Sequence, residues 1–459
     1  MTNPYRIDPV WAFRAIIGLG FLAMLGANMP GQLSVDSVTQ LHEGRFHLRE
    51  TWAPAIYAAI LGGFDRLTPG TGFYLMASGL LLGGSLLALP NLRSRITWLA
   101  PVVGLAVVMS PALLIYQGIV WKDVLFANLG VASFVTLAHV AKVWRQPNRP
   151  WLALIALALM LALAAQVRQN GLIAAGVAAI VLAWTARDDG WPSVLSWSVG
   201  GLIAVVLLSV GMGYLAQPAK SGPDDATQRG IYVLQRYDLV GASARDKTMV
   251  LKDIVAADPE VARTIRTHAV PLYSPERVDY LHLDPSVDAA FRGLRPGVVG
   301  HQWWTLIRES PQAYLAHRLD VFRWVFLTPM IDSCLPIFTG VDGQPRMLRD
   351  LKIPPGVDRG DQRLYNYGSW FLDTPVFSHL TYALICLAAG IVLLIRGEPQ
   401  DVAIAGLVAA GLGFAASFFV ISVACDYRYL YFLDLTALTA LIYLAIDPPV
   451  RALGLGRPK

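Results

Sequence analysis

The sequence carries little charge for its length. Asp, Glu, Lys and Arg make up 15% of the 459 residues, whereas soluble domains carry about 25%. Hydrophobic residues make up 55% of the chain, and they gather in repeated runs close to 20 residues long. This combination excludes an ordinary soluble enzyme and predicts a chain that is solvated mostly by lipid.

Cysteine is also scarce. The three cysteines are Cys334, Cys386 and Cys425, and Cys386 lies inside an apolar run. This placement predicts no disulfide framework. The eight histidines and the cysteines show no spacing typical of a metal site, so the sequence predicts no metal ligands.

Several catalytic and binding motifs are missing. The sequence has no Gly-x-Ser-x-Gly elbow, no phosphate-cradling glycine loop and no Gly-x-Gly-x-x-Gly, which argues against hydrolases, ATPases and dinucleotide-binding enzymes. It has no basic run with interleaved aromatics, which argues against nucleic-acid binding. The net charge of +5 is modest and fits anionic lipid surfaces or phosphate-bearing substrates.

The apolar runs predict an all-α polytopic membrane protein. About ten spans are expected, with nine or eleven to thirteen also compatible with the pattern. The first run is read as a retained signal anchor, and the short apolar segment from Pro54 to Leu67 as a helix lying in the membrane interface. The spans are expected at about 11–29, 71–90, 97–116, 124–142, 151–167, 171–186, 194–215, 376–396, 402–423 and 429–447.

Basic residues in the short turns predict the orientation. With both termini in the cytoplasm, every basic turn falls on the cytoplasmic side, as the positive-inside rule requires. The predicted organisation is a transmembrane module over 1–215 with an outward catalytic loop at 30–70, a mixed but mainly helical periplasmic domain over 216–375, and C-terminal helices over 376–459. Helical periodicity is expected at 247–257 and 303–326 within the outward domain. The basic turns include Arg93, Arg95, Lys142, Arg149, Arg187 and Arg396, with Arg451, Arg457 and Lys459 in the tail.

Four outward ends of the predicted spans carry polar or charged residues. Snorkelling explains a single Lys or Arg at a helix end, but it explains short Asp side chains poorly. Asp residues recurring at one membrane level therefore favour a shared polar cavity. The four groups are Asp36 with Glu43, Lys122 with Asp123, Arg168 with Gln169 and Asn170, and Asp426 with Tyr427 and Arg428.

A polyprenyl-phosphate sugar would suit such a cavity. Lys122, Arg168 and Arg428 are the predicted ligands of its phosphate, which gains negative charge as the glycosidic bond breaks. Asp36 is predicted to deprotonate the acceptor hydroxyl as general base, with inversion at the anomeric carbon. The alternative for Asp36 is a helix cap or an ion-pair partner of Arg45 or Arg49.

The remaining candidates have weaker signals. Glu43 lies seven residues after Asp36 and would share its face on a helix, where it could orient the acceptor or pair with Arg45 or His47. Arg168 has membrane anchoring as its alternative, and Trp121 and Trp303 are read as interfacial aromatics. The predicted substrate-binding residues are Gln40, Arg45, Gln117, Asp123, Asn170, Asp426 and Tyr427.

The membrane part of the chain resembles the GT-C superfamily of lipid-phosphosugar-dependent glycosyltransferases. The resemblance covers about 1–215 and 376–447. It is carried by Asp36 after the first span, by Trp52-Ala53-Pro54-Ala55-Ile56-Tyr57, by Trp121-Lys122-Asp123 and by Arg168-Gln169-Asn170-Gly171. The chain looks most similar to bacterial members that act on envelope glycans or lipids, namely the O-antigen glucosyltransferase and aminoarabinose or mannosyl transferase relatives.

The resemblance implies a catalytic role for Asp36. Many relatives have a His-Pro-Pro-like or second acidic motif in this loop, whereas this chain reads Thr-Trp-Ala-Pro, so the second acid is open between Glu43 and Glu50. A divalent cation, Mg²⁺ or Mn²⁺, is not clearly required.

The expected function is an inverting glycosyltransferase, hexosyl or pentosyl, in the bacterial inner membrane. It would move a sugar from a polyprenyl-phosphate donor to an envelope glycan or lipid, with lipopolysaccharide among the candidate acceptors. The alternatives are a transporter or flippase of lipid-linked sugars, and a non-catalytic envelope assembly subunit.

Overall fold

The computed structural model describes residues 8–51, 53–217, 226–295 and 297–448. Within these ranges the chain is helical, and its few β-type contacts are isolated bridges rather than strands. The all-α prediction is therefore confirmed. Trp52 and the basic residues of the C-terminal tail, for which the sequence made predictions, lie outside the described residues.

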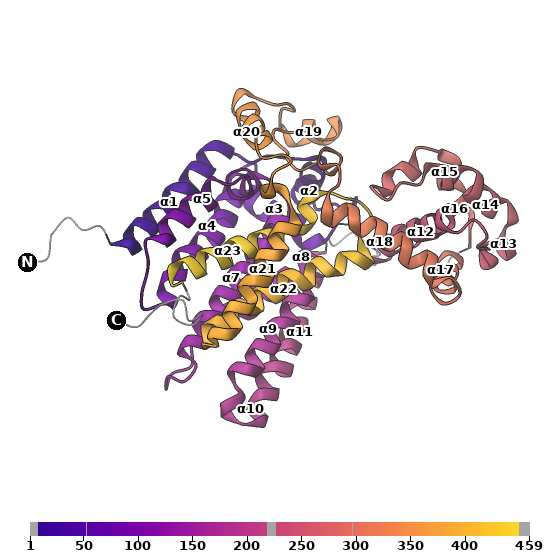
Figure 1. The fold of residues 1–459 in the computed structure, drawn as a ribbon. Helices are drawn as coiled ribbons and strands as arrows, with labels where there is room; N and C mark the ends of the chain where they lie inside the picture. The colour runs from indigo at the N-terminus through magenta and orange to yellow at the C-terminus, as the bar shows by residue number, and fades with distance from the viewer. Residues whose placement is uncertain (1–7, 52, 218–225, 296, 449–459) are drawn as a thin grey trace, which may run out of the picture. The chain divides into compact units, whose positions relative to one another are not determined.

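The chain divides into two compact units (Figure 1). The first contains Met1–Gly222, Ile337–Phe414 and Leu430–Lys459, and the second contains Pro223–Pro336 and Ala415–Tyr429. The predicted outward domain of 216–375 is thus divided, because its last part packs with the transmembrane module rather than with the rest of that segment.

All ten predicted apolar segments form helices in the described part of the chain. Seven helical segments are long and apolar enough to cross a membrane, and an eighth consists of two helices with a bend between them. Two further apolar helices are shorter, α8 (Trp151–Val167) and α9 (Leu172–Thr185). The long segments are α1 (Pro9–Asn28), α4 with η1 (Gly72–Leu92), α7 (Lys122–Val143), α10 to α11 (Trp191–Ala216), α21 (His379–Arg396), α22 (Pro399–Ile421) and η9 with α23 (Tyr427–Ile446).

The bent segment joins α5 (Leu99–Met109) to α6 (Pro111–Leu114) and η2 (Tyr116–Gly118), with an angle of 59° at the break. Pro111 lacks a backbone N–H and cannot continue the preceding helical ladder, which explains the break. The carbonyl of Met109 at the end of α5 accepts a hydrogen bond from the Tyr367 hydroxyl instead. Tyr367 belongs to α20 (Arg359–Ser369), an outlying helix of the first unit.

Helix α7 is the central helix of the first unit. Nearly all of its residues are buried, and it packs against α4, α8 and α23. Gly130 allows the closest approach, because a side chain there would overlap the Phe432 ring of α23. By contrast, α1 exposes large apolar side chains, with Trp11 at 67% and Leu19 at 65% exposure. Such a surface is stable in contact with lipid and costly in water.

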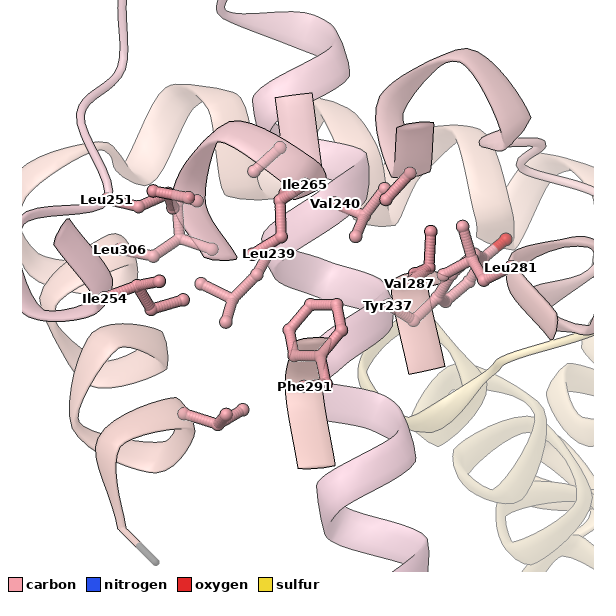
Figure 2. Close-up of a cluster of buried hydrophobic side chains, with 14 of the residues drawn as sticks. Tyr237, Leu239, Val240, Leu251, Ile254, Ile265, Leu281, Val287, Phe291 and Leu306 are labelled. Carbon is pink, nitrogen blue, oxygen red and sulfur yellow. The ribbon is translucent and has the colours of Figure 1, made fainter. Parts of the chain in front are cut away.

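The second unit packs short helices around a separate hydrophobic core. Figure 2 shows Tyr237, Leu239, Val240, Ile265 and Phe291 among the side chains that meet there. Their main helices are α12 (Ala226–Arg245), α13 (Lys252–Ala257), α14 (Pro259–Thr264), α16 (Pro285–Gly293), α17 (Val298–Glu309) and α18 (Pro311–Leu327).

Two predictions for this segment need correction. The helix expected over 303–326 is interrupted at Ser310, where α17 ends and α18 begins with Pro311 at its first position. The cysteines also differ from expectation, because Cys334 and Cys425 form a disulfide across 91 residues while Cys386 is free and buried. The apolar run around Cys386 correctly indicated that Cys386 forms no disulfide, but it did not indicate whether Cys334 and Cys425 pair.

A buried charge network joins α12 to α17 and α18. The carboxylate of Asp238 accepts a hydrogen bond from the Trp303 indole and contacts both His317 and Arg318, and these three charged or titratable side chains are fully buried. The Tyr273 hydroxyl lies 2.8 Å from Nδ1 of His317. Trp303 is therefore a hydrogen-bonding partner within this unit.

Candidate functional site

Asp36 lies in the first turn of a helix rather than in a loop. Helix α2 (Val35–Phe46) begins after Ser34, and the Ser34 and Ser37 side chains form a reciprocal capping box at its start. This cap satisfies backbone donors that the first turn would leave open. The Asp36 side chain is exposed, and a carboxylate in the first turn interacts favourably with the positive end of the helix dipole.

A parallel bridge holds the start of α2 against the segment that precedes Lys122. Gln32 pairs with Ile119, with a hydrogen bond of 2.9 Å from the Gln32 N–H to the Gly118 carbonyl and one of 3.0 Å from the Val120 N–H to the Gln32 carbonyl. A glycine is required at 118, because a side chain there would overlap Asn28.

Two side-chain hydrogen bonds strengthen this contact. The Trp121 indole N–H donates to the Ser34 hydroxyl at 2.8 Å, and the Ser37 hydroxyl donates to the Val120 carbonyl at 2.7 Å. Trp121 is only 5% exposed, so it is a buried structural contact and not the interfacial aromatic predicted from the sequence. The turn that carries Asp36 and the turn that carries Lys122 are thereby held side by side.

A third segment joins the same place. Leu33 pairs with Val341, since the Leu33 N–H donates to Gly340 and the Asp342 N–H donates to Leu33. The Asp342 side chain is exposed. Sequence reasoning missed this acid because it lies more than 300 residues from Asp36 and inside a segment assigned to the outward domain.

Asp123 and Arg168, which belong to two of the polar groups singled out in the sequence, form an ion pair. Asp123 lies in the first turn of α7, and its carboxylate is 2.8 Å from the Arg168 guanidinium at the end of α8. The pair is nearly buried, with side-chain exposures of 3% and 11%. Lys122 is half-buried beside it, so the three residues carry one net positive charge. Asn170 follows in the turn after Arg168 and is also half-buried.

Glu43 is buried, whereas Asp36 on the same helix is exposed. Its exposure is 1%, and its Oε1 accepts hydrogen bonds from the Glu50 and Thr51 N–H groups and from the Thr51 hydroxyl. Glu43 thus fixes the connection that follows α2. Because Asp36 and Glu43 lie on one continuous helix, the seven-residue spacing keeps them on the same side of α2, but the end of α2 that carries Glu43 packs against α3 (Ala55–Leu67).

Arg45 is committed to a structural ion pair. Its guanidinium bonds both carboxylate oxygens of Asp65 at 2.7 and 2.5 Å and also donates to the Leu351 carbonyl. Burial opposes ionisation of Asp65, but the Arg45 guanidinium and the Gly70 N–H hold the pKa of this carboxyl below its usual range. These contacts account for Arg45 without a substrate.

Gln40 and Gln117 are also buried, at 4% and 1% exposure. The Gln117 amide exchanges hydrogen bonds with Asn128 and donates to the Tyr431 hydroxyl. Both oxygen and nitrogen of that amide are satisfied by the helices themselves, so Gln117 has a clear scaffold role.

Asp426, Tyr427 and Arg428 lie in the second unit. Asp426 contacts Arg428 at 3.1 Å and Arg277 at 3.1 Å. Arg277 had no signal in the sequence, because it comes from a polar segment with no nearby apolar run. The adjacent Cys425 and its disulfide fix the backbone of this group.

The described residues contain no cluster of three or more His, Cys, Asp or Glu side chains that could hold a metal ion.

In the first unit an exposed carboxylate, Asp36, and a half-buried ammonium, Lys122, lie on segments that are linked by direct hydrogen bonds. A carboxylate can accept a proton from a hydroxyl, and an ammonium can stabilise an oxyanion. This pairing suits transfer of a group from an anionic leaving group to a hydroxyl.

No protein-family model matches the chain, and no curated protein matches it. Among solved structures, the chain is similar to the archaeal oligosaccharyltransferase AglB from Archaeoglobus fulgidus, solved in complex with an inhibitory peptide and a dolichol-phosphate. The sequence identity is 11% and the TM-score is 0.41. The match covers 97% of this chain and 52% of that chain, so this chain spans about half the length of its structural neighbour.

Proposed function

We propose that the chain is a membrane glycosyltransferase of the GT-C type that moves a sugar from a polyprenyl-phosphate donor to a hydroxyl of an envelope glycan or lipid. The observation that carries this proposal is the clamp between the Asp36 turn and the Lys122 turn. It links the segment that carries Asp36 to the segment that carries Lys122, and both segments adjoin helices of membrane-spanning length.

In this proposal Asp36 removes the proton from the acceptor hydroxyl as its oxygen attacks the anomeric carbon. The bond between that carbon and the phosphate oxygen breaks, and the phosphate leaves with the bonding electrons. Lys122 stabilises the charge that develops on the phosphate, and attack from the opposite face gives inversion.

The role of Arg168 in this scheme depends on its ion pair with Asp123. Its guanidinium is paired with Asp123 at 2.8 Å, so the pair contributes a dipole rather than a full positive charge. We assign Arg168 to orientation of the phosphate and Asp123 to holding the guanidinium in place. The assignments of Asn170, Asp426 and Tyr427 to substrate binding, and of Arg428 to the donor phosphate, remain predictions from the sequence.

An apolar cavity offers a place for the isoprenoid chain of the donor. It has a volume of about 210 Å³ and lies between α8, α9 and α11, with Trp151, Leu157, Leu161, Ala178 and Val205 among its lining residues. Leu161 is seven residues before Arg168, which corresponds to about 10 Å along a helix. A lipid phosphate at Arg168 could therefore extend its chain into this cavity.

The proposed location is the bacterial inner membrane, with the site facing the periplasm and both termini in the cytoplasm. The support is the distribution of basic turns. The disulfide between Cys334 and Cys425 fits an oxidising compartment on the periplasmic side of the membrane.

The experiment is sugar transfer by the full chain in nanodiscs, with a panel of polyprenyl-phosphate sugars and envelope extract as acceptor. Transfer with inversion supports the proposal. Movement of labelled lipid across the bilayer without transfer identifies a flippase instead. If the chain shows neither sugar transfer nor lipid movement with any donor, the result contradicts the proposal and supports a non-catalytic assembly subunit.

A further inference from the structure

The second unit contains the end of a helix of membrane-spanning length. Helix α22 meets the length and composition of a span, and residues 415–429 belong to the same unit as α18. The segment after α22 is joined to this unit by backbone hydrogen bonds, from the Val278 N–H to the Val423 carbonyl and from the Cys425 N–H to the Glu276 carbonyl. The end of α22 is therefore fixed against the helices of the second unit.

The C-terminal half of α18 runs back along α22. The Arg318 guanidinium donates to the Ser422 carbonyl at 2.7 Å, one residue after α22 ends. One turn further along α18, the Phe322 ring meets the Phe419 ring edge to face, with their centroids 5.9 Å apart. The two contacts follow each other in opposite order along the two helices. From Arg318 onward, α18 therefore points toward the lipid layer that α22 crosses.

The chain then turns and comes back to the end of α22. Helix α18 ends at Leu327, and Thr328 after it adopts the left-handed conformation with φ of 42°. The short helix η7 (Ile331–Cys334) follows, and Cys334 forms the disulfide with Cys425, close after the end of α22. Residues 319–334, named here the hairpin, thus leave the end of α22 and return to it.

The outer side of the hairpin is apolar. Leu319, Leu327 and Met330 are 60%, 45% and 62% exposed. Phe322 and Phe326 are half-buried and lie on the same face of α18 as Leu319, whereas the buried residues of this helix lie on the other side. A contiguous exposed apolar surface is costly in water and is typical of a site that contacts a partner or a membrane.

This apolar side continues a surface that α22 presents to lipid. Val420 and Ile421, in the last turn of α22, are 46% and 39% exposed. The contact between Phe322 and Phe419 joins the hairpin to the same turn. The continuity of the two surfaces favours the surrounding bilayer as the partner of the hairpin.

The charged residues of the hairpin are compatible with this partner. Asp320 forms an ion pair with Arg245 on α12. Arg323 is exposed, and its long side chain can reach the headgroup phosphates while its stem stays among apolar groups. Asp332 is exposed two residues before Cys334, where the chain has returned to the end of α22.

We propose that the hairpin dips into the bilayer beside α22, with Leu319, Leu327 and Met330 in contact with lipid acyl chains. The nine residues from Arg318 to Leu327 extend about 14 Å along a helix. The hydrocarbon layer is about 30 Å thick, so the hairpin enters one leaflet and returns from it. The second unit is thereby held at the membrane by the hairpin as well as by α22, and this contact does not depend on sugar transfer.

The test is photolabelling of the full chain in phosphatidylcholine nanodiscs that contain an analogue with a diazirine at the end of one acyl chain. Illumination attaches the lipid to the side chains that the acyl chains touch. After reduction and trypsin digestion, the hairpin lies in peptides 319–323 and 324–346. Peptide 15–45 with Leu19 of α1 is the positive control, and peptide 278–292 is the matched control, because its Leu283 is 70% exposed in the same unit.

Lipid adducts in peptides 319–323 and 324–346 should exceed those in peptide 278–292 about tenfold, since acyl chains stay within the hydrocarbon layer. Adducts in peptide 15–45 without any excess in the two hairpin peptides would overturn the proposal. The same holds if the hairpin stays unlabelled and mass photometry shows dimers that Met330→Glu separates, because a second copy of the chain then covers this surface.

A pair of matched variants tests the tip of the hairpin. Met330→Glu and Leu283→Glu each place a carboxylate at an exposed apolar position, and thermal unfolding checks that both variants fold. Met330→Glu should lower the adduct yield in peptide 324–346 about tenfold, because a carboxylate is excluded from hydrocarbon. Leu283→Glu should leave that yield unchanged. A yield equal to wild type in Met330→Glu would contradict insertion of the tip.

Discussion

The indole N–H of Trp121 donates a hydrogen bond of 2.8 Å to the hydroxyl of Ser34. Ser34 caps the helix that carries Asp36, and Trp121 directly precedes Lys122. This hydrogen bond therefore helps to fix the relative position of the segments that carry the proposed base and the proposed phosphate ligand, although 87 residues separate its two partners.

Trp121→Phe removes this donor and keeps an aromatic ring in place. We expect kcat for transfer to fall about three- to tenfold, since a buried hydrogen bond contributes about 1 kcal/mol and Asp36 would lose its fixed position. Steady-state kinetics check this, with Trp370→Phe as the control because Trp370 is 78% exposed. A kcat equal to that of the control would show that the clamp does not position Asp36.

Gly44 and Gly62 allow α2 and α3 to pack backbone to backbone. A side chain at either position would overlap the backbone of the facing helix, at Ala58 or at Gly44 itself. We expect Gly62→Ala to lower the free energy of unfolding by about 1–3 kcal/mol, as overpacking does, and to reduce transfer. Gly63→Ala is a matched control with open space around it. Equal stability of the two variants, measured by thermal unfolding in detergent, would contradict this packing.

The buried pair of Asp123 and Arg168 predicts a strong energetic coupling. Removing one partner leaves an uncompensated buried charge, so Asp123→Asn and Arg168→Gln should each destabilise the chain by about 3–5 kcal/mol. The double variant should lose clearly less free energy of unfolding than the two single variants lose together. The exposed pair of Arg145 and Asp188 provides a control cycle, whose coupling should be below about 1 kcal/mol. Additive effects at the buried pair would refute the contact.

The cysteine pairing predicts one reactive thiol in the unfolded, unreduced chain. Alkylation in denaturant should modify Cys386 alone, and prior reduction should expose Cys334 and Cys425 as well. Peptide mass spectrometry checks both results. Labelling of all three residues without reductant would rule out the disulfide.

His317 predicts that the stability of its unit depends on pH. Burial lowers the pKa of this imidazole from 6.5 to about 3, so the unfolded chain binds a proton there at a pH where the folded chain does not. Stability is therefore complete above pH 6.5 and falls as the pH decreases toward 3. Hydrogen exchange of peptides from α12 and α18 should show this decline, and His317→Gln should remove most of its slope. A slope equal to wild type in that variant would assign the effect to other groups.

The membrane helices could be predicted from the sequence because lipid imposes a length and a composition on each one separately. The break at Pro111 is equally local, although the apolar pattern alone reads through it. The pairing of Cys334 with Cys425 was not predictable, since only the fold brings residues 91 positions apart into contact.

The candidate site shows the same division. Polar residues at helix ends indicated Asp36, Lys122, Asp123 and Arg168, because an apolar background makes such residues conspicuous. The interaction partners of the other candidates could not be predicted from the sequence. Arg45 pairs with Asp65, and Glu43 accepts a hydrogen bond from the connection after α2. The contribution of residues 340–342, including Asp342, depends on contacts with Leu33 that span about 300 residues of sequence.

The most direct test of the account is transfer by Asp36→Asn, with donor binding measured on the same preparation. Asparagine keeps the size and the helix-terminal position but cannot accept the acceptor proton. The account predicts unchanged donor binding and a fall in kcat of about a hundredfold or more, on the order expected for loss of a general base. Transfer by Asp36→Asn at close to the wild-type rate, or a comparable loss only in Asp342→Asn, would contradict the assignment of Asp36 as the base.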